Sequence, residues 1–146
     1  MKNKKAFTLI ELLVVIAIIG LLATLSVLAL NNARAKSRDA KRVADIKQMQ
    51  TALELYFNDK QSYPTSSEMV SSISSYDPTS GTSTYMQVIP TSPNPQATAC
   101  TGAGGDVYTY TQDSAGASYS LNYCLEGNVG TITGEELHTA TNAALY

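Results

Sequence analysis

The feature that most constrains this chain is an apolar run near its N-terminus, Phe7 to Leu30, which contains a single charge, Glu11. As a helix, such a run would span about 36 Å, more than the roughly 30 Å hydrocarbon core of a bilayer. It is also longer than the apolar region of an ordinary secretory signal peptide, the alternative for which Ala33 to Ala35 would mimic a cleavage site. We therefore predict a retained membrane-spanning helix, with room beyond it for one small soluble domain.

The residues before this run form a short basic leader, Met1 to Ala6 (MKNKKA), with three lysines. Positive residues beside a spanning segment stay in the cytoplasm, because anionic headgroups and the membrane potential disfavour their translocation. The N-terminus is therefore predicted to be cytoplasmic, and the rest of the chain to face outward.

Charge is distributed very unevenly along the chain. All ten Lys and Arg residues lie at or before Lys60, together with five acids, whereas the following 86 residues contain seven acids and no Lys or Arg. Binding to nucleic acid depends on Lys and Arg side chains that displace counterions from phosphates. The C-terminal part is therefore not expected to bind nucleic acid directly.

Two cysteines lie in this acidic part, Cys100 and Cys124, with 23 residues between them. An exported domain meets an oxidising compartment, so we expect a disulfide between them. Closing such a loop would stabilise the fold by about 3 kcal/mol. Two unpaired thiols are the alternative, and a metal site is less favoured because no His or further Cys lies near either residue.

Between Asn31 and Lys60 the sequence becomes charged but keeps a helical period, and residues 21 to 60 contain no Pro or Gly. We predict one continuous helix from about Phe7 to about Asp59. In its second half, apolar residues recur every three or four positions and so share one face: Val43, Ile46, Met49, Leu53, Tyr56 and Phe57. On its surface the spacing predicts modest pairing of Lys41 with Asp45 and of Asp39 with Arg42.

The helix is predicted to end at Ser62-Tyr63-Pro64, because the residue before a proline avoids helical geometry. Thr65 to Glu68 has the spacing of a capping box, which predicts a short second helix over about residues 66–75. Residues 65–84 are rich in Ser and Thr and are interpreted as loop-rich surface, with O-linked sugars as a less favoured alternative.

A period of two replaces the helical period after Pro95. Residues 107–111 and 118–124 alternate in this way around a loop at Gln112 to Gly116, which predicts an antiparallel hairpin. A third short strand is expected near Val129 to Thr133, and residues 134–146 show no clear pattern. The tyrosines of these strands are expected to pack the sheet.

The sharpest motif is Lys5-Ala6-Phe7-Thr8-Leu9-Ile10-Glu11, which opens the apolar run. It resembles the N-terminal signal of type IV prepilins and type II secretion pseudopilins, and the resemblance extends in detail to about residue 64. It implies an α+β pilin fold, a long N-terminal α-helix packed on a small antiparallel β-sheet. It also implies cleavage between Ala6 and Phe7 by a membrane prepilin peptidase, followed by methylation of the Phe7 amine.

These observations divide the chain into a leader (1–6), an apolar half-helix that enters a membrane or a filament core (7–30), an amphipathic half-helix (31–60) and a C-terminal head (61–146).

A carboxylate at the position of Glu11 costs free energy in an apolar medium and needs a partner. The hypothesis is that Glu11 pairs with the Phe7 amine of an adjacent subunit.

Catalysis is not expected, because the one histidine, His138, lies in the unpatterned tail and is interpreted as solvated. No cofactor is expected, although acidic residues of the head are candidate calcium ligands without the usual ligand spacing: Asp106, Asp113, Glu126, Glu135 and Glu136.

The function that the resemblance implies is a structural subunit of a pilus or pseudopilus. The precursor would reside in the bacterial inner membrane and be polymerised by inner-membrane assembly machinery into a surface or periplasmic homo-oligomeric filament. The alternative is a signal-anchored, monomeric surface binding protein.

Overall fold

The computed structural model describes residues 7–69, 71–78, 81–95, 97, 107–134 and 136–143. It comprises two compact units, residues 1–35 and residues 36–146. Helix α1 (Leu9–Lys60) passes through both, so the predicted continuous helix is confirmed to within two residues at its start and one at its end. The predicted leader, Met1 to Ala6, lies outside the described residues.

The first unit consists of the beginning of α1 alone, as far as the structure describes it. Every side chain from Phe7 to Arg34 is exposed, including sixteen large apolar residues between Phe7 and Leu30. By length and composition, this is the one helix among the described residues that could cross a membrane.

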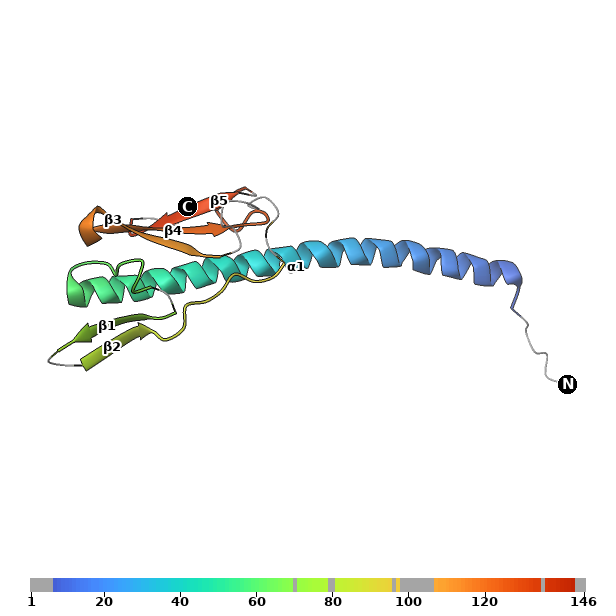
Figure 1. Cartoon of the computed structure of the whole chain (residues 1–146). Coiled ribbons are helices and arrows are strands. Elements are labelled where there is room, and N and C mark those ends of the chain that lie inside the picture. The colour runs from blue at the N-terminus through green and yellow to red at the C-terminus, as the bar shows by residue number, and fades with distance from the viewer. Residues whose placement is uncertain are drawn as a thin grey trace. The chain divides into compact units, whose positions relative to one another are not determined.

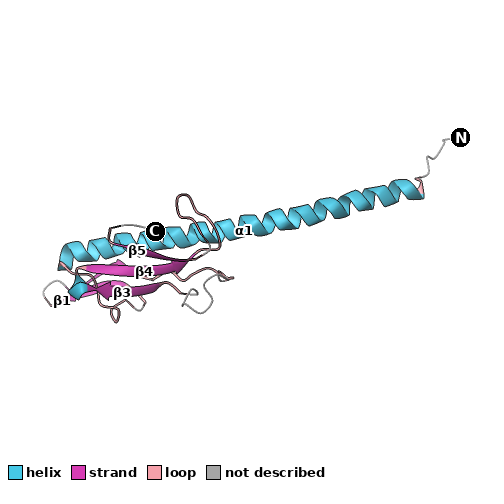
Figure 2. Ribbon diagram, turned by 90° about the horizontal axis from the view of Figure 1, so that it is seen from above, coloured by secondary structure: helices cyan, strands magenta, loops and turns pink. Residues whose placement is uncertain are grey.

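The second unit has two antiparallel sheets. Strand β1 (Ile73–Asp77) pairs with β2 (Gly81–Met86), and a three-stranded sheet has the order β3 (Thr109–Asp113), β4 (Ser118–Cys124), β5 (Leu137–Thr141). Within this unit the second part of α1 lies between the two sheets (Figure 1). Figure 2 shows β3, β4 and β5 running alongside the helix. This is an α+β fold in which one long N-terminal helix packs on antiparallel sheets, as predicted.

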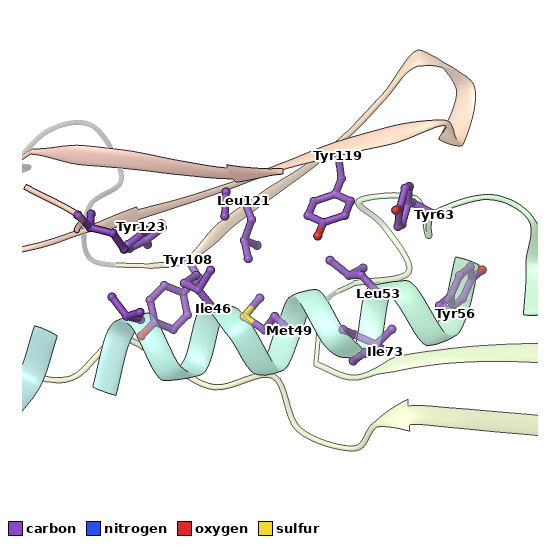
Figure 3. Packing of buried hydrophobic residues seen from close by; sticks show 14 of the residues in the cluster. Ile46, Met49, Leu53, Tyr56, Tyr63, Ile73, Tyr108, Tyr119, Leu121 and Tyr123 are labelled. Carbon is purple, nitrogen blue, oxygen red and sulfur yellow. The ribbon is translucent and has the colours of Figure 1, made fainter. Parts of the chain in front are cut away.

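The core of the second unit forms where the apolar face of α1 meets both sheets (Figure 3). Ile46 and Leu53 are completely buried, Met49 is 1% exposed, and Phe57 lies at the margin of the core. The larger sheet contributes Tyr119, Leu121, Tyr123 and Ala140, and the hairpin contributes Ile73. The predicted helix face and the packing role of the strand tyrosines are confirmed.

The predicted short helix over residues 66–75 is wrong. Thr65 to Glu68 forms a turn, and strand β1 begins at Ile73. Strand β2 follows within the stretch interpreted as loop, and Gly81 adopts a φ of 84° at its start. The strand is favoured because Ile73 and Ser75 both point inward at a spacing of two and Ser75 bonds Tyr85, whereas a helix would send them to different faces.

The predicted hairpin of β3 and β4 is confirmed, with Asp113 paired to Ser118 and a 3₁₀ turn, η2 (Ser114–Gly116), between them. Gly116 has a φ of 91°, and a Cβ there would lie 3.0 Å from the Ser62 Cβ, so this position requires glycine. The tip of the hairpin is held to the end of α1, because the Tyr63 N–H donates to the Gly116 carbonyl (2.9 Å).

The third strand is not where it was predicted. Val129 and Ile132 form an isolated bridge, whereas β5 occupies the tail that showed no pattern. In β5 the buried residues are His138 and Ala140, and Leu137 is 40% exposed. Buried and more exposed side chains do alternate along β5, but the buried ones are His and Ala and not branched aliphatic residues. The hydrophobicity pattern of the sequence therefore did not reveal this strand.

Candidate functional site

The start of α1 is closed by a capping box formed by Thr8 and Glu11. The Thr8 N–H donates to Glu11 Oε2 (2.8 Å), the Thr8 hydroxyl donates to the same oxygen (2.7 Å), and the Glu11 N–H donates to Thr8 Oγ1 (3.3 Å). Such a box satisfies amide groups that the first turn of a helix leaves unpaired. Sequence reasoning assigned Glu11 to assembly and missed this local role, although Thr-x-x-Glu is visible in the sequence.

An apolar surface surrounds this carboxylate. Phe7 is 80% exposed and Ile10 is 68% exposed, and together with Glu11, Val14 and Val15 they line a shallow depression on the helix. Isolated in water, such a surface is unfavourable, since each buried Å² of apolar area is worth about 25 cal/mol. The segment is therefore suited to burial in lipid or against other apolar helices. Ala6, the other predicted processing residue, lies outside the described residues.

A second constellation lies in the second unit, around the buried guanidinium of Arg42. This residue is 1% exposed, and its Nη1 donates to Asp39 Oδ1 (2.6 Å) and to Glu126 Oε1 (2.7 Å). Its Nη2 donates to the carbonyls of Pro93 and Pro95, both at 3.1 Å, and its Nε lies 3.3 Å from Ser92 Oγ. The guanidinium thus ties α1 to two separate loops of the head.

Arg38, Asp39 and Glu126 complete this ionic cluster. Arg38 Nε donates to Glu126 Oε1 (2.7 Å) and its Nη2 to Glu126 Oε2, and the Glu126 N–H donates to both Asp39 oxygens (3.0 Å). The Arg38 hydrogen bond, helped by Arg42 and opposed by partial burial, lowers the pKa of Glu126. The two arginines and the two carboxylates of the cluster therefore balance in charge.

The predicted pairing of Asp39 with Arg42 is confirmed, but its predicted position on the surface is wrong, because Asp39 is 2% exposed. Their spacing of three indicates contact but cannot indicate burial, and Glu126 is 84 residues away from Arg42. Asp45 is also buried, and it accepts a hydrogen bond from the Tyr108 hydroxyl (2.9 Å). The predicted surface pair of Asp45 with Lys41 is therefore wrong. Burial, followed by this bond to Asp45, raises the pKa of Tyr108.

Among the remaining predicted residues, Cys124 is buried and packs beside Ala97, while Cys100 lies outside the described residues, so the disulfide remains a prediction. His138 is not solvated as interpreted: it is 7% exposed and its ring lies 5.5 Å from that of Tyr123.

Of the candidate calcium ligands, Asp106 and Glu135 lie outside the described residues, and Glu126 is bound to two arginines. Within the described ranges no three His, Cys, Asp or Glu side chains gather as a metal site would require. Asp113 and Glu136 are both exposed. The prediction that the chain needs no cofactor, with calcium as the less favoured alternative, therefore stays untested.

Comparisons with known proteins bear directly on the N-terminal segment. A family model described as the prokaryotic N-terminal methylation motif matches residues 1–27. The type II secretion system core protein G of Vibrio cholerae serotype O1 is 30% identical over 132 residues, which cover 90% of this chain and 78% of that protein. The chain belongs to the family of type IV pilins and type II secretion pseudopilins.

Other members of this pilin family match a shorter part of the chain. The type II secretion system core protein G of Escherichia coli K12 is 40% identical over 71 residues, 49% of each chain. The type IV major pilin protein PilA of Myxococcus xanthus is 36% identical over 61 residues, 42% of this chain and 28% of that protein. For the first relatives the matched part spans about half of their length. No solved structure gave a significant match.

Proposed function

We propose that this pilin-family chain is a structural, non-enzymatic subunit of a filament of the type IV pilus or type II secretion pseudopilus class. The observation that supports it most is the first part of α1, where 28 consecutive side chains from Phe7 to Arg34 are exposed and most of them are apolar. Filament formation would bury this surface against the same segment of other copies. The similarity to pilins and pseudopilins supports the same assignment.

Processing precedes assembly in this proposal. Prepilin peptidase cleaves between Ala6 and Phe7 on the cytoplasmic side, and the new amine of Phe7 is methylated. The methylation motif over residues 1–27 supports this, as does the position of Phe7, immediately before the helix and 80% exposed. Cleavage also removes the three lysines of the leader, so the N-terminal end of the segment would be held less firmly on the cytoplasmic side.

Glu11 then supplies the register between subunits. Its Oε2 is occupied by the Thr8 N–H and hydroxyl, whereas no hydrogen bond to Oε1 is found within the described residues. The carboxylate can therefore keep its capping role and accept the cationic amine of Phe7 from a neighbouring copy through its second oxygen. Pairing would neutralise both charges in an apolar surrounding, where an unpaired charge is costly.

The location follows from the same segment. Before assembly the apolar half-helix lies in the bacterial inner membrane, with the N-terminus in the cytoplasm and the head outside. Inner-membrane assembly machinery extracts it into a filament in the periplasm or on the cell surface. The head, with no Lys or Arg after Lys60, is not a nucleic-acid binder.

The proposal is tested in cells that contain the prepilin peptidase and the assembly machinery. Mass spectrometry of the mature chain should find a methylated Phe7 at its start, and sheared filaments should contain the protein. An intact Met1 in a monomeric membrane protein, or a start near Lys36, would refute the proposal.

The role of Glu11 is tested separately. Glu11→Ala should reduce filament yield strongly while leaving processing intact, and Glu11→Gln should restore helix capping in part but not the pairing of charges. A normal filament yield from both variants would show that Glu11 does not set the register.

A further inference from the structure

The second unit carries charges of opposite sign at its two ends along α1. At the end where α1 enters the unit, three lysines are exposed and form no ion pair with any described residue: Lys36, Lys41 and Lys47. We call these three residues the basic end. The acids of the same stretch, Asp39 and Asp45, are buried, so folding removes them from the surface.

The two arginines at this end do not add to its exposed charge, because Asp39 and Glu126 neutralise Arg38 and Arg42. One exposed acid, Glu136, lies nearby at the start of β5, where its carbonyl accepts from the Leu125 N–H (3.3 Å). Among the described residues, three exposed lysines and one exposed carboxylate give this end a positive charge.

The opposite end, where α1 finishes, is acidic. Four exposed carboxylates gather there from α1, the turn after it and the tip of the β3–β4 hairpin: Glu54, Asp59, Glu68 and Asp113. We call these four residues the acidic end. Tyrosine and threonine hydroxyls donate to three of them, which positions the carboxylates and leaves their charge in place. Lys60, partly buried, is the one cation at this end among the described residues.

Lys47 and Glu54 lie about 11 Å apart along the helix and line one pocket, but the other charges of the two ends are too far apart to pair within one chain. Lys41 and Asp59 are 18 residues apart on one helix, which separates them by about 27 Å, well beyond the roughly 8–10 Å over which exposed charges interact in salt. The charges that each end needs are therefore available on a second copy shifted along the helix axis, and not on the same molecule.

We propose that the basic end of one copy docks on the acidic end of the next copy along the filament. This rests on the proposed function and adds to it a contact between heads, distinct from the pairing of Glu11 with Phe7. A contact between two different surfaces of identical chains is heterologous, and repeated with a shift along an axis it gives an open filament and not a closed dimer. Like ends repel, so the contact also fixes the polarity of neighbouring heads.

The test uses two full-length variants in the assembling cells. The first, Lys36→Glu with Lys41→Glu, makes both ends acidic, and the second, Asp59→Lys with Asp113→Lys, makes the acidic end basic. Tyr85, which donates to Asp59, lies 3.1 Å from Ser75 Oγ and so keeps a partner in the second variant. Each variant expressed alone should lose filament yield by about tenfold, since two attractive contacts become repulsive.

Co-expression of the two variants decides the question. An alternating copolymer restores opposite charges at every contact, so the yield should return to near the wild-type level, with both chains in the same filaments. Glu136→Lys is the matched control: it is the same acid-to-lysine exchange, but at the basic end, and should not lower the yield.

Loss of yield in each variant without recovery on co-expression would overturn the proposal, and would indicate that the lysines meet another anionic surface such as lipid headgroups. An unchanged yield in both variants would overturn it as well. In either case, wild-type filaments with a methylated Phe7 would leave the proposed function standing.

Discussion

The two parts of α1 are one continuous helix of 52 residues, yet they use their side chains in opposite ways. Before Ala35 the helix exposes leucine, isoleucine and valine on every side, and after it the helix buries an arginine and two aspartates. The two parts differ because the chain supplies packing partners for the side chains of only one of them. The second part finds its partners in the head, whereas the first part finds none among the described residues and must obtain them from other molecules.

The largest effect on the stability of the head is expected at Arg42. Arg42→Ala leaves Asp39 buried without its cation and Glu126 with one arginine in place of two, which should cost about 3–5 kcal/mol of unfolding free energy. Arg34→Ala, the matched exchange in the first part of the helix where the side chain is exposed, should change it by less than about 0.5 kcal/mol. Urea unfolding of the full chain in detergent, followed by near-ultraviolet circular dichroism of the tyrosines, measures both.

Arg42→Lys separates the charge of this side chain from its geometry. A lysine keeps the charge but cannot reach Asp39, Glu126 and the two proline carbonyls together, so its stability should fall between wild type and Arg42→Ala. Equal stability of Arg42→Ala and Arg34→Ala would mean that the buried cluster contributes nothing to holding α1 in the head.

The next effect compares the same residue type in both parts of the helix. Leu53 is completely buried and Leu22 is 57% exposed, so Leu53→Ala should cost about 2–5 kcal/mol of head stability and Leu22→Ala close to none. The same urea titration reports both. If Leu22→Ala destabilised the head as much as Leu53→Ala, the division of the helix at Ala35 would be wrong.

A smaller effect is expected from the protonation of Glu126. Arg38 and Arg42 lower the pKa of this carboxyl in the folded head, so its ionised form stabilises the fold at pH values above its unfolded pKa of about 4.3. This contribution is lost as the pH falls through the lowered folded pKa. Glu126→Gln should be less stable than wild type at pH 7, and the difference should shrink below about pH 4. A difference independent of pH would exclude charge as the cause.

The sequence predicts those features that depend on neighbours in the chain. The apolar run, the helix face of Ile46, Met49 and Leu53 and the hairpin around Gly116 are all periodic or local, and all are confirmed. The buried ionic cluster was missed because Arg42 and Glu126 become neighbours only after folding. Strand β5 was missed because its inward residues are His138 and Ala140, which a hydrophobicity pattern does not distinguish from loop.

Two capping boxes show most directly that a local sequence motif does not determine the structure that follows it. Thr8 with Glu11 and Thr65 with Glu68 have the same spacing, and in both the threonine N–H and hydroxyl donate to one glutamate oxygen at 2.7–2.8 Å. The first begins a helix of 52 residues and the second forms a single turn before β1. The box fixes one turn, and what continues it depends on the packing of the residues that follow, here Ile73 against the core.

The smallest expected effect tests this equivalence of the two boxes. Thr65→Val keeps the shape of the side chain but removes the hydroxyl that donates to Glu68, and should cost about 0.5–1 kcal/mol of head stability, as the loss of a cap does. Thr8→Val removes the matching hydroxyl at Glu11, but the residues of the segment it caps are exposed and are not part of the core cluster, so urea unfolding of the head should be unchanged. Its effect should appear instead as fraying of the first turn, measured by faster hydrogen exchange of the Leu9 and Ile10 amides in detergent. If Thr65→Val left head stability unchanged, the second box would be a hydrogen-bonded turn that contributes nothing to the fold, and the two motifs would share geometry without sharing a role.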